Sequence, residues 1–269
     1  MNYLQKGQFH GQTNKTIHLD GIIITDTEYT HDKVDWHYHE NAYFTFILEG
    51  NVIEGNKKEK YNCSAGSLLF HNWEDAHYNI KPKGFTRGFH VELQPMWFND
   101  IWLDIDCLQG SIDVTNPDVK ILFYKIFKEC KSYDDMSALA VRELLIRTFT
   151  HLRGTTESRP ARQPQWVDTI RQILHDDCCS TYSLEGLGQT GDIHPVHLSR
   201  DFHKYFHCGV SEYVRKLRVQ KSLTLLSNAT LPLTTVALDC GFADQSHFTR
   251  CFKEMMQMTP FKYRKLLLS

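Results

Sequence analysis

Several features that would place this protein in another class are missing from its sequence. No apolar run approaches the roughly 18–20 residues that a membrane-spanning helix needs. The N-terminal stretch MNYLQKGQFHGQ has no apolar signal core, so export is not expected. None of the eight cysteines forms a C-x-x-C pair, which argues against a zinc ribbon or a disulfide framework. We therefore expect reduced, mostly buried thiols in a cytoplasmic protein without a membrane partner.

The composition fits a folded chain of one large or two ordinary domains. The 269 residues are 41% hydrophobic and 23% charged, which excludes a disordered chain. The formal net charge of −2 does not by itself indicate nucleic acid. The polar segment 154–165, GTTESRPARQPQ, holds two prolines and a glycine and predicts a linker between domains at 1–153 and 166–269.

The N-terminal part changes its hydrophobic period along the chain. Between residues 20 and 93, short runs rich in β-branched and aromatic residues alternate with Gly, Asn and Pro, as in a sandwich or barrel. Apolar residues then recur at helical spacing over 116–131 and 134–153. Two helices are therefore expected to close the first domain.

The C-terminal part is predicted to be helical throughout and contains an internal repeat. The predicted helices cover 165–178, 183–190, 195–206, 210–227, 232–239, 244–256 and 260–268. His197-Leu-Ser-Arg-Asp-Phe202 returns 50 residues later as His247-Phe-Thr-Arg-Cys-Phe252, and Tyr213 and Tyr263 keep the same offset. Two copies of one supersecondary unit explain this pattern.

Each copy has the sequence pattern of a helix-turn-helix. In the second copy a short helix is followed by Gly241 at the turn and by Asp244 as the N-cap of the next helix. Helical spacing there turns Phe248, Phe252 and Met255 inward. A second helix of this kind fits the major groove of double-stranded DNA.

The outward faces of the two recognition helices supply the candidate DNA-binding residues. They are Val196, Ser199, Arg200, His203 and Lys204 in the first copy, and Gln245, Ser246, Thr249, Arg250 and Lys253 in the second. Arg200 and Arg250 occupy equivalent positions, where arginine can bond guanine bidentately. Phosphate contact or a structural salt bridge is the alternative for either one.

Residues 183–268 resemble the DNA-binding domain of the AraC/XylS family of transcriptional regulators. The resemblance rests on LSRDFHKYF-x-x-G-V-S-E-Y-V-x-x-x-R, VALDCGFADQSHFTRCFK and MTPFKYR. It implies a sequence-specific regulator that responds to a small-molecule effector. It also implies a homodimer formed through helices 116–131 and 134–153, and contact with RNA polymerase.

The first unit departs from the family pattern at its support helix, turn and cap. Gly188 stands where the family usually has alanine, Asp192 at the turn glycine, and His194 at the N-cap serine. Gly191 replaces an apolar residue. Glycine in a helix and a missing cap each cost about 1 kcal/mol. We expect the first unit to be less stable than the second.

Residues 20–95 are similar to the cupin-like sensor domain of many family members. His37 and His39 share one face of a strand, and the stretch Cys63–His77 resembles the second half of a cupin motif. The expected effector pocket comprises His37, His39, Tyr43, Trp73, His77 and Glu92. His37, His39 and His77 are candidate metal ligands. Metal-binding cupins usually have a glutamate ligand a few residues after the H-x-H pair, and this chain has none at that position. Glu92, on a later strand, could take the place of that ligand. An organic effector without a cofactor is favoured.

The sequence thus predicts an α+β two-domain protein. A cupin-like β-barrel with two helices precedes an all-α domain of about seven helices with two helix-turn-helix units. A cupin enzyme with an accessory helical domain is one alternative, and the incomplete metal-ligand set argues against it. A non-DNA-binding interaction protein with a decayed first unit is the other. We expect a regulator and not an enzyme.

Overall fold

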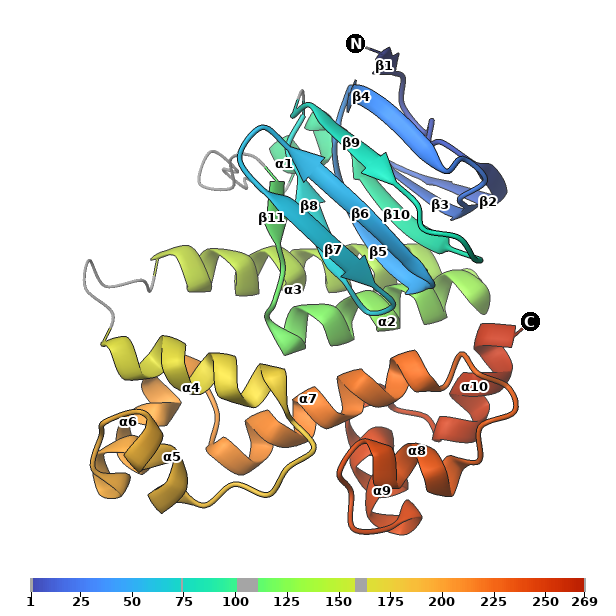
Figure 1. Cartoon of the computed structure of the whole chain (residues 1–269). Helices are drawn as coiled ribbons and strands as arrows, with labels where there is room; N and C mark the ends of the chain where they lie inside the picture. The colour runs from blue at the N-terminus through green and yellow to red at the C-terminus, as the bar shows by residue number, and fades with distance from the viewer. Residues whose placement is uncertain (1, 74, 101–110, 158–163, 269) are drawn as a thin grey trace. The chain divides into compact units, whose positions relative to one another are not determined.

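The computed structural model describes residues 2–73, 75–100, 111–157 and 164–268, and the chain divides into two compact units between Arg153 and Gly154 (Figure 1). The division falls where the polar segment 154–165 begins. Helix α3 (Ser137–Glu157) continues four residues into that segment, since its first proline comes only at position 160. Residues 158–163 lie outside the described part. No helix in the described ranges is long and apolar enough to cross a bilayer.

The N-terminal unit contains two facing β-sheets. One has the strand order β1-β4-β9-β6-β7 and the other the order β11-β8-β5-β10-β3-β2, and β1 with β4 is the parallel pair in an otherwise antiparallel arrangement. The first sheet comprises β1 (Asn2–Leu4), β4 (Lys33–His39), β9 (His77–Ile80), β6 (Asn51–Asn56) and β7 (Lys60–Ser64). The second comprises β11 (Ser111–Asp113), β8 (Leu68–His71), β5 (Ala42–Glu49), β10 (Arg87–Leu93), β3 (Ile22–Glu28) and β2 (Gln12–Leu19). The two sheets form the β-barrel that the sequence predicts.

The two faces of the six-stranded sheet have different roles, set by the alternation of side chains along each strand. Phe44 and Phe46 of β5 face outward and pack on α2 (Pro117–Lys131), with Phe44 4.6 Å from Phe123 between ring centroids. Phe44 also contacts Phe149 of α3. The intervening residues of β5 face the other sheet. One face therefore forms the apolar core with two helices, and the other is left for a cavity.

The C-terminal unit has seven described helices, at the positions that the sequence predicts. They are α4 (Gln165–Asp176), α5 (Leu184–Thr190), α6 (Pro195–Phe206), α7 (Val210–Leu225), α8 (Leu233–Asp239), α9 (Gln245–Met256) and α10 (Pro260–Leu268). Helices α5–α6 and α8–α9 are the two helix-turn-helix units, and α7 joins them (Figure 1). All but one of the seven described cysteines are buried, and all seven are free.

The structure differs from the sequence prediction in several details. Strands β1, β2 and β11 and the short helix α1 (Pro95–Asp100) were not predicted; the first two are polar edge strands with little apolar alternation. In α9, Met256 is fully buried and Met255 only half-buried. Met256 lies four residues after Phe252, so it continues the same helical stripe.

Candidate DNA-binding surface and ligand cavity

The recognition helix α9 is fixed at its start by two hydrogen bonds. The Asp244 carboxylate accepts from the backbone N–H of His247 at 2.7 Å, as predicted for an N-cap. The Gln245 side-chain oxygen accepts from the Thr234 hydroxyl of α8 at 2.7 Å. Fully buried Phe248 and Phe252 anchor the inner face. The helix therefore presents a rigid outer face.

The predicted DNA-binding residues lie on the outer faces of α6 and α9. Nine of the ten are exposed and one, Thr249, is half-buried; the exposed nine are Val196, Ser199, Arg200, His203, Lys204, Gln245, Ser246, Arg250 and Lys253. Each helix thus offers a mostly polar strip with two cationic side chains opposite its aromatic core face, namely Arg200 and Lys204 on α6 and Arg250 and Lys253 on α9.

The two equivalent arginines differ in their surroundings. The Arg200 guanidinium donates to both carboxylate oxygens of Asp201, at 2.8 and 3.1 Å, and contacts His197 Nδ1 at 3.1 Å. The residue that corresponds to Asp201 in the second copy is Cys251, and Arg250 forms no ion pair within the described part of the chain. Arg250 is therefore ready to bond a new acceptor, whereas Arg200 must first release an existing one.

The turn of the first unit is one residue shorter than that of the second. In each unit an N–H in the turn bonds a carbonyl five residues back, from Ile193 to Gly188 and from Phe242 to Ala237. Ile193 directly precedes the cap His194, whereas Ala243 intervenes before Asp244. A Cβ atom at Gly188 would lie 2.7 Å from the Ile193 carbonyl oxygen. The unusual glycine is thus required by close packing.

Two other departures in the first unit have a measurable cost. His194 caps α6 through Nδ1 at 3.3 Å from the Val196 N–H, longer than the Asp244 bond. Asp192 adopts a left-handed conformation with φ 52°, where Gly241 of the second unit has φ 77°. Both favour the predicted lower stability of the first unit.

Replacing Asp192 with glycine is expected to stabilise the first unit. Glycine adopts positive φ without the steric cost that aspartate incurs, so the free energy of unfolding should rise by about 1 kcal/mol. Hydrogen exchange in α5 and α6 measures this change, with α8 and α9 as the internal reference. Slower exchange confined to α5 and α6 is expected; unchanged or faster exchange there would contradict the assignment of strain to Asp192.

The second candidate site is a cavity of about 480 Å³, its open mouth included, between the two sheets of the N-terminal unit. Four of the six predicted pocket residues line it: His37, His39, Tyr43 and His77. The other two lie elsewhere. Trp73 is 41% exposed and is not in the lining. Glu92 is buried, but its carboxylate accepts from the Asn41 side-chain amide at 2.6 Å and the Gly7 N–H at 2.7 Å.

The cavity also includes residues that sequence reasoning missed. His10, Tyr29, His31, Glu54 and His90 are part of its lining. The position of His90 in the cavity could have been predicted from the sequence. His90 follows Phe89 on β10, and because Phe89 faces outward, His90 must face the other sheet. His10 and His31 lie in loops, where side chains do not alternate between two faces as they do along a strand.

Burial keeps five histidines in and beside this cavity neutral. Desolvation lowers the pKa of His37 to about 3, that of His77 to about 4 and that of His90 to about 3. The pKa values of His39 and His71 are also well below the ordinary range, for the same reason. Neutral imidazoles have free lone pairs and serve as acceptors or ligands.

Hydrogen bonds connect two of these rings to hydroxyl groups, and a third ring lies against a carboxyl group. The Tyr43 hydroxyl lies 3.0 Å from His77 Nε2, and the Tyr29 hydroxyl 3.0 Å from His90 Nε2. Glu54 Oε1 lies 3.0 Å from His71 Nε2. Burial raises the pKa of Glu54 to about 8, so this pair is neutral overall. The part of the wall formed by these histidines, tyrosines and Glu54 is thus polar but uncharged, and Lys81 adds one cationic side chain to the lining.

Comparison with known proteins agrees with this architecture. A family profile described as "Helix-turn-helix domain" matches residues 191–266, which include both recognition helices. The Msm operon regulatory protein of Streptococcus mutans is 22% identical over 250 residues, covering 84% of each chain. The arabinose operon regulatory protein of Escherichia coli is 24% identical over 81% of this chain and 78% of its own length. The chain is therefore similar to transcriptional regulators of the AraC/XylS family and contains a helix-turn-helix domain.

One further regulator and one solved structure align with nearly the whole chain. The HTH-type transcriptional activator RhaR of Salmonella dublin is 21% identical, covering 91% of this chain and 92% of RhaR. A crystal structure of apo ToxT from Vibrio cholerae is 13% identical, with a TM-score of 0.41, and the alignment covers 93% of this chain and 98% of ToxT. The alignments with the regulators named here include residues of both units and are not confined to the helix-turn-helix units.

Proposed function

We propose that this regulator binds a specific double-stranded DNA site through α6 and α9, and that a ligand in the N-terminal cavity alters that binding. The observation that carries the proposal is the pair of exposed cationic faces on two recognition helices, each with a buried aromatic inner face. A ligand shifts such an equilibrium only if it binds one conformation of the protein more tightly than the other.

Arg250 is expected to contribute more to DNA affinity than Arg200. Arg250→Ala should weaken binding by about 1–3 kcal/mol at one base position if it reads a base. Arg200→Ala should cost less, since Arg200 must give up its bonds to Asp201 before it reaches DNA. Gel-shift titrations with selected operator fragments measure both losses.

The matched control for this comparison is Asp201→Ala, which frees Arg200 without removing it. It should leave affinity unchanged or raise it. Binding should also weaken steeply as salt rises, because phosphate contacts release counterions. Equal losses for Arg200→Ala and Arg250→Ala would contradict the assignment, and salt-independent binding would contradict the DNA interface itself.

The regulator is proposed to act as a homodimer in the cytoplasm, without catalysis, and to contact RNA polymerase from its DNA site. Support for the dimer comes from exposed apolar side chains at the start and along one side of α3. Met136 and Leu139 are 64% and 63% exposed, and Ile146 lies two turns beyond Leu139 and is 43% exposed. Isolated exposed apolar residues are common, but side chains spaced three and seven residues apart lie on one side of a helix, which suits antiparallel pairing with a second copy.

A further inference from the structure

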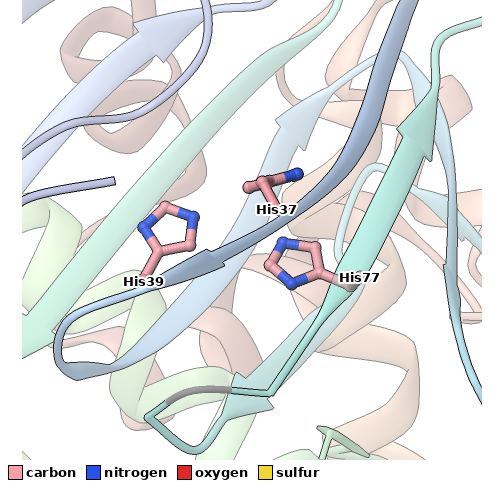
Figure 2. Close-up of side chains that lie close together, drawn as sticks. All are labelled: His37, His39 and His77. Atoms are coloured by element: carbon pink, nitrogen blue, oxygen red, sulfur yellow. The ribbon is translucent and has the colours of Figure 1, made fainter. Parts of the chain in front are cut away.

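Three histidines of the cavity converge from two neighbouring strands. His37 of β4 lies directly opposite His77 of β9 in an antiparallel pair, and His39 follows two residues later on the same face. One ring nitrogen from each of the three lies within 4.8 Å of the others. Figure 2 shows the three rings grouped around one space between the strands. All three side chains are buried.

The hydrogen bonds of two of these rings fix their tautomers. His37 Nδ1 lies 2.9 Å from the Asp35 carbonyl oxygen, and His77 Nδ1 lies 3.1 Å from the Asp75 carbonyl oxygen. A carbonyl oxygen only accepts, so each Nδ1 carries the proton and each Nε2 has the lone pair. Metal-ligating histidines are usually held this way, with the second nitrogen donating to a carbonyl or carboxylate.

The third ring has an unsatisfied atom. His39 Nδ1 is buried and has no hydrogen-bond partner among the described residues. An orphaned buried nitrogen costs roughly 1–3 kcal/mol. A ligand bound by this ring nitrogen would supply the partner that it lacks among the described residues.

The surrounding groups define what kind of ligand fits. The Glu92 carboxylate is engaged by Asn41 and Gly7, and Glu54 lies against His71, so neither belongs to the trio. The donors are therefore three neutral imidazoles. Three histidines form a known ligand set of tetrahedral zinc sites, with water or a small anion in the fourth position. Calcium and magnesium prefer oxygen ligands and are disfavoured.

We propose that His37, His39 and His77 together bind one late first-row divalent metal ion, of the Zn²⁺ class, inside the cavity. The Tyr43 hydroxyl that now contacts His77 Nε2 turns away when the ion binds. A regulatory role for the ion rests on the proposed function. The binding of the ion does not depend on that function.

A direct test uses the full chain after treatment with a chelator and removal of the chelator. Co²⁺ is titrated in the absence of DNA, and its visible absorption reports the coordination geometry; Zn²⁺ is then added as competitor. We expect one Co²⁺ per chain, a tetrahedral spectrum, and displacement by one equivalent of Zn²⁺. No stoichiometric binding, or an octahedral spectrum of a weakly bound ion, overturns the proposal.

His39→Ala is the decisive variant, because removing this ring leaves the hydrogen bonds of His37 and His77 in place. Co²⁺ affinity should fall at least ~100-fold in this variant and in His77→Ala, given that even outer partners of metal ligands alter affinity 10–100-fold. His31→Ala is the matched control, since His31 lines the same cavity outside the trio. Circular dichroism checks that each variant is folded.

Equal affinity in wild type and His39→Ala, or an equal loss in His31→Ala, overturns the assignment of ligands. Should His39→Ala fail to fold, His39→Gln keeps a polar side chain of similar reach and is held to the same criterion. Because no DNA is present, failure here leaves the DNA-binding proposal intact, and failure of the gel-shift experiment leaves this one intact.

Discussion

Gly241→Ala is expected to destabilise the second helix-turn-helix unit by about 3 kcal/mol. Gly241 has φ 77°, and a left-handed backbone costs a residue with a Cβ about 1–2 kcal/mol. The new Cβ atom would also lie 2.4 Å from the Cys179 carbonyl oxygen and 2.7 Å from the Cys179 Cα atom. Overpacking of this kind typically costs a further 1–3 kcal/mol.

Hydrogen bonds hold the Cys179 backbone in its position next to Gly241. Arg218 of α7 donates to the carbonyl oxygens of Cys178, Cys179 and Ser180, at 2.8, 3.3 and 2.8 Å. Lys221 also donates to the Cys179 sulfur at 3.0 Å. Moving the loop away from Gly241 would break these bonds. We therefore expect the turn that contains Gly241 to be distorted by the substitution.

Hydrogen exchange over α8 and α9 measures the effect of Gly241→Ala, with loss of DNA affinity as a second readout. A change of about 3 kcal/mol corresponds to roughly 100-fold faster exchange by global opening of the unit. Gly209→Ala is the matched control, because Gly209 has φ −77° and its Cβ atom would meet nothing within 4 Å. Similar exchange in the two variants would contradict the close approach at Gly241.

The metal-free N-terminal unit is expected to lose stability in acid. His90 is buried with a pKa of about 3, whereas an unfolded histidine titrates near 6.5. Below pH 6.5 the unfolded chain therefore binds a proton that the folded chain does not. The stability is complete above pH 6.5 and declines as the pH falls toward 3. At pH 5 His90 alone removes about 2 kcal/mol.

Carboxyl groups with raised pKa values oppose this trend, namely Glu54, Glu92 and Asp113. Glu54 has a folded pKa of about 8, so its contribution to stability rises as the pH falls. Five buried histidines titrate in the opposite direction, at positions 37, 39, 71, 77 and 90. The histidines outnumber the carboxyl groups with raised pKa values, so we expect the histidines to determine the net sign.

Calorimetry at pH 7 and pH 5 tests this expectation, and His90→Gln isolates one histidine. A glutamine amide does not titrate and still bonds the Tyr29 hydroxyl, so the variant should lose about 2 kcal/mol less than wild type between the two pH values. The exposed His18→Gln is the control and should behave as wild type. A melting temperature that is equal at both pH values in wild type would show that the histidines are not buried neutral groups.

The C-terminal unit was predictable because its structure depends on local signals. Pro195 at the start of α6, Asp244 as the cap of α9 and the repeat of His197–Phe202 fix helix positions within the span of a few residues. The pairing of Arg200 with Asp201 was not predictable. Neighbouring residues on a helix usually point apart, so this contact depends on the rotamer that the arginine adopts.

The cavity was predictable only in part, since it depends on contacts between distant strands. The alternation of His37 and His39 along β4 shows that they share a face, but not that His77 lies opposite. Glu92 was assigned to the cavity as a substitute ligand, yet Asn41 lies close enough to engage its carboxylate. The residues 101–110 and 158–163 lie outside the described structure.

The bonds from Arg218 to the loop at Cys178–Ser180 also limit how this protein can be recombined with its relatives. The loop precedes α5 in the chain, yet the Cys179 backbone lies against the turn between α8 and α9. A chimera that exchanges only α8 and α9 would bring a foreign turn against this backbone. A chimera that keeps residues 177–180, α7 and the turn between α8 and α9 from this protein should retain the fold. Altered DNA specificity is best introduced by substitutions on the outer face of α9 alone.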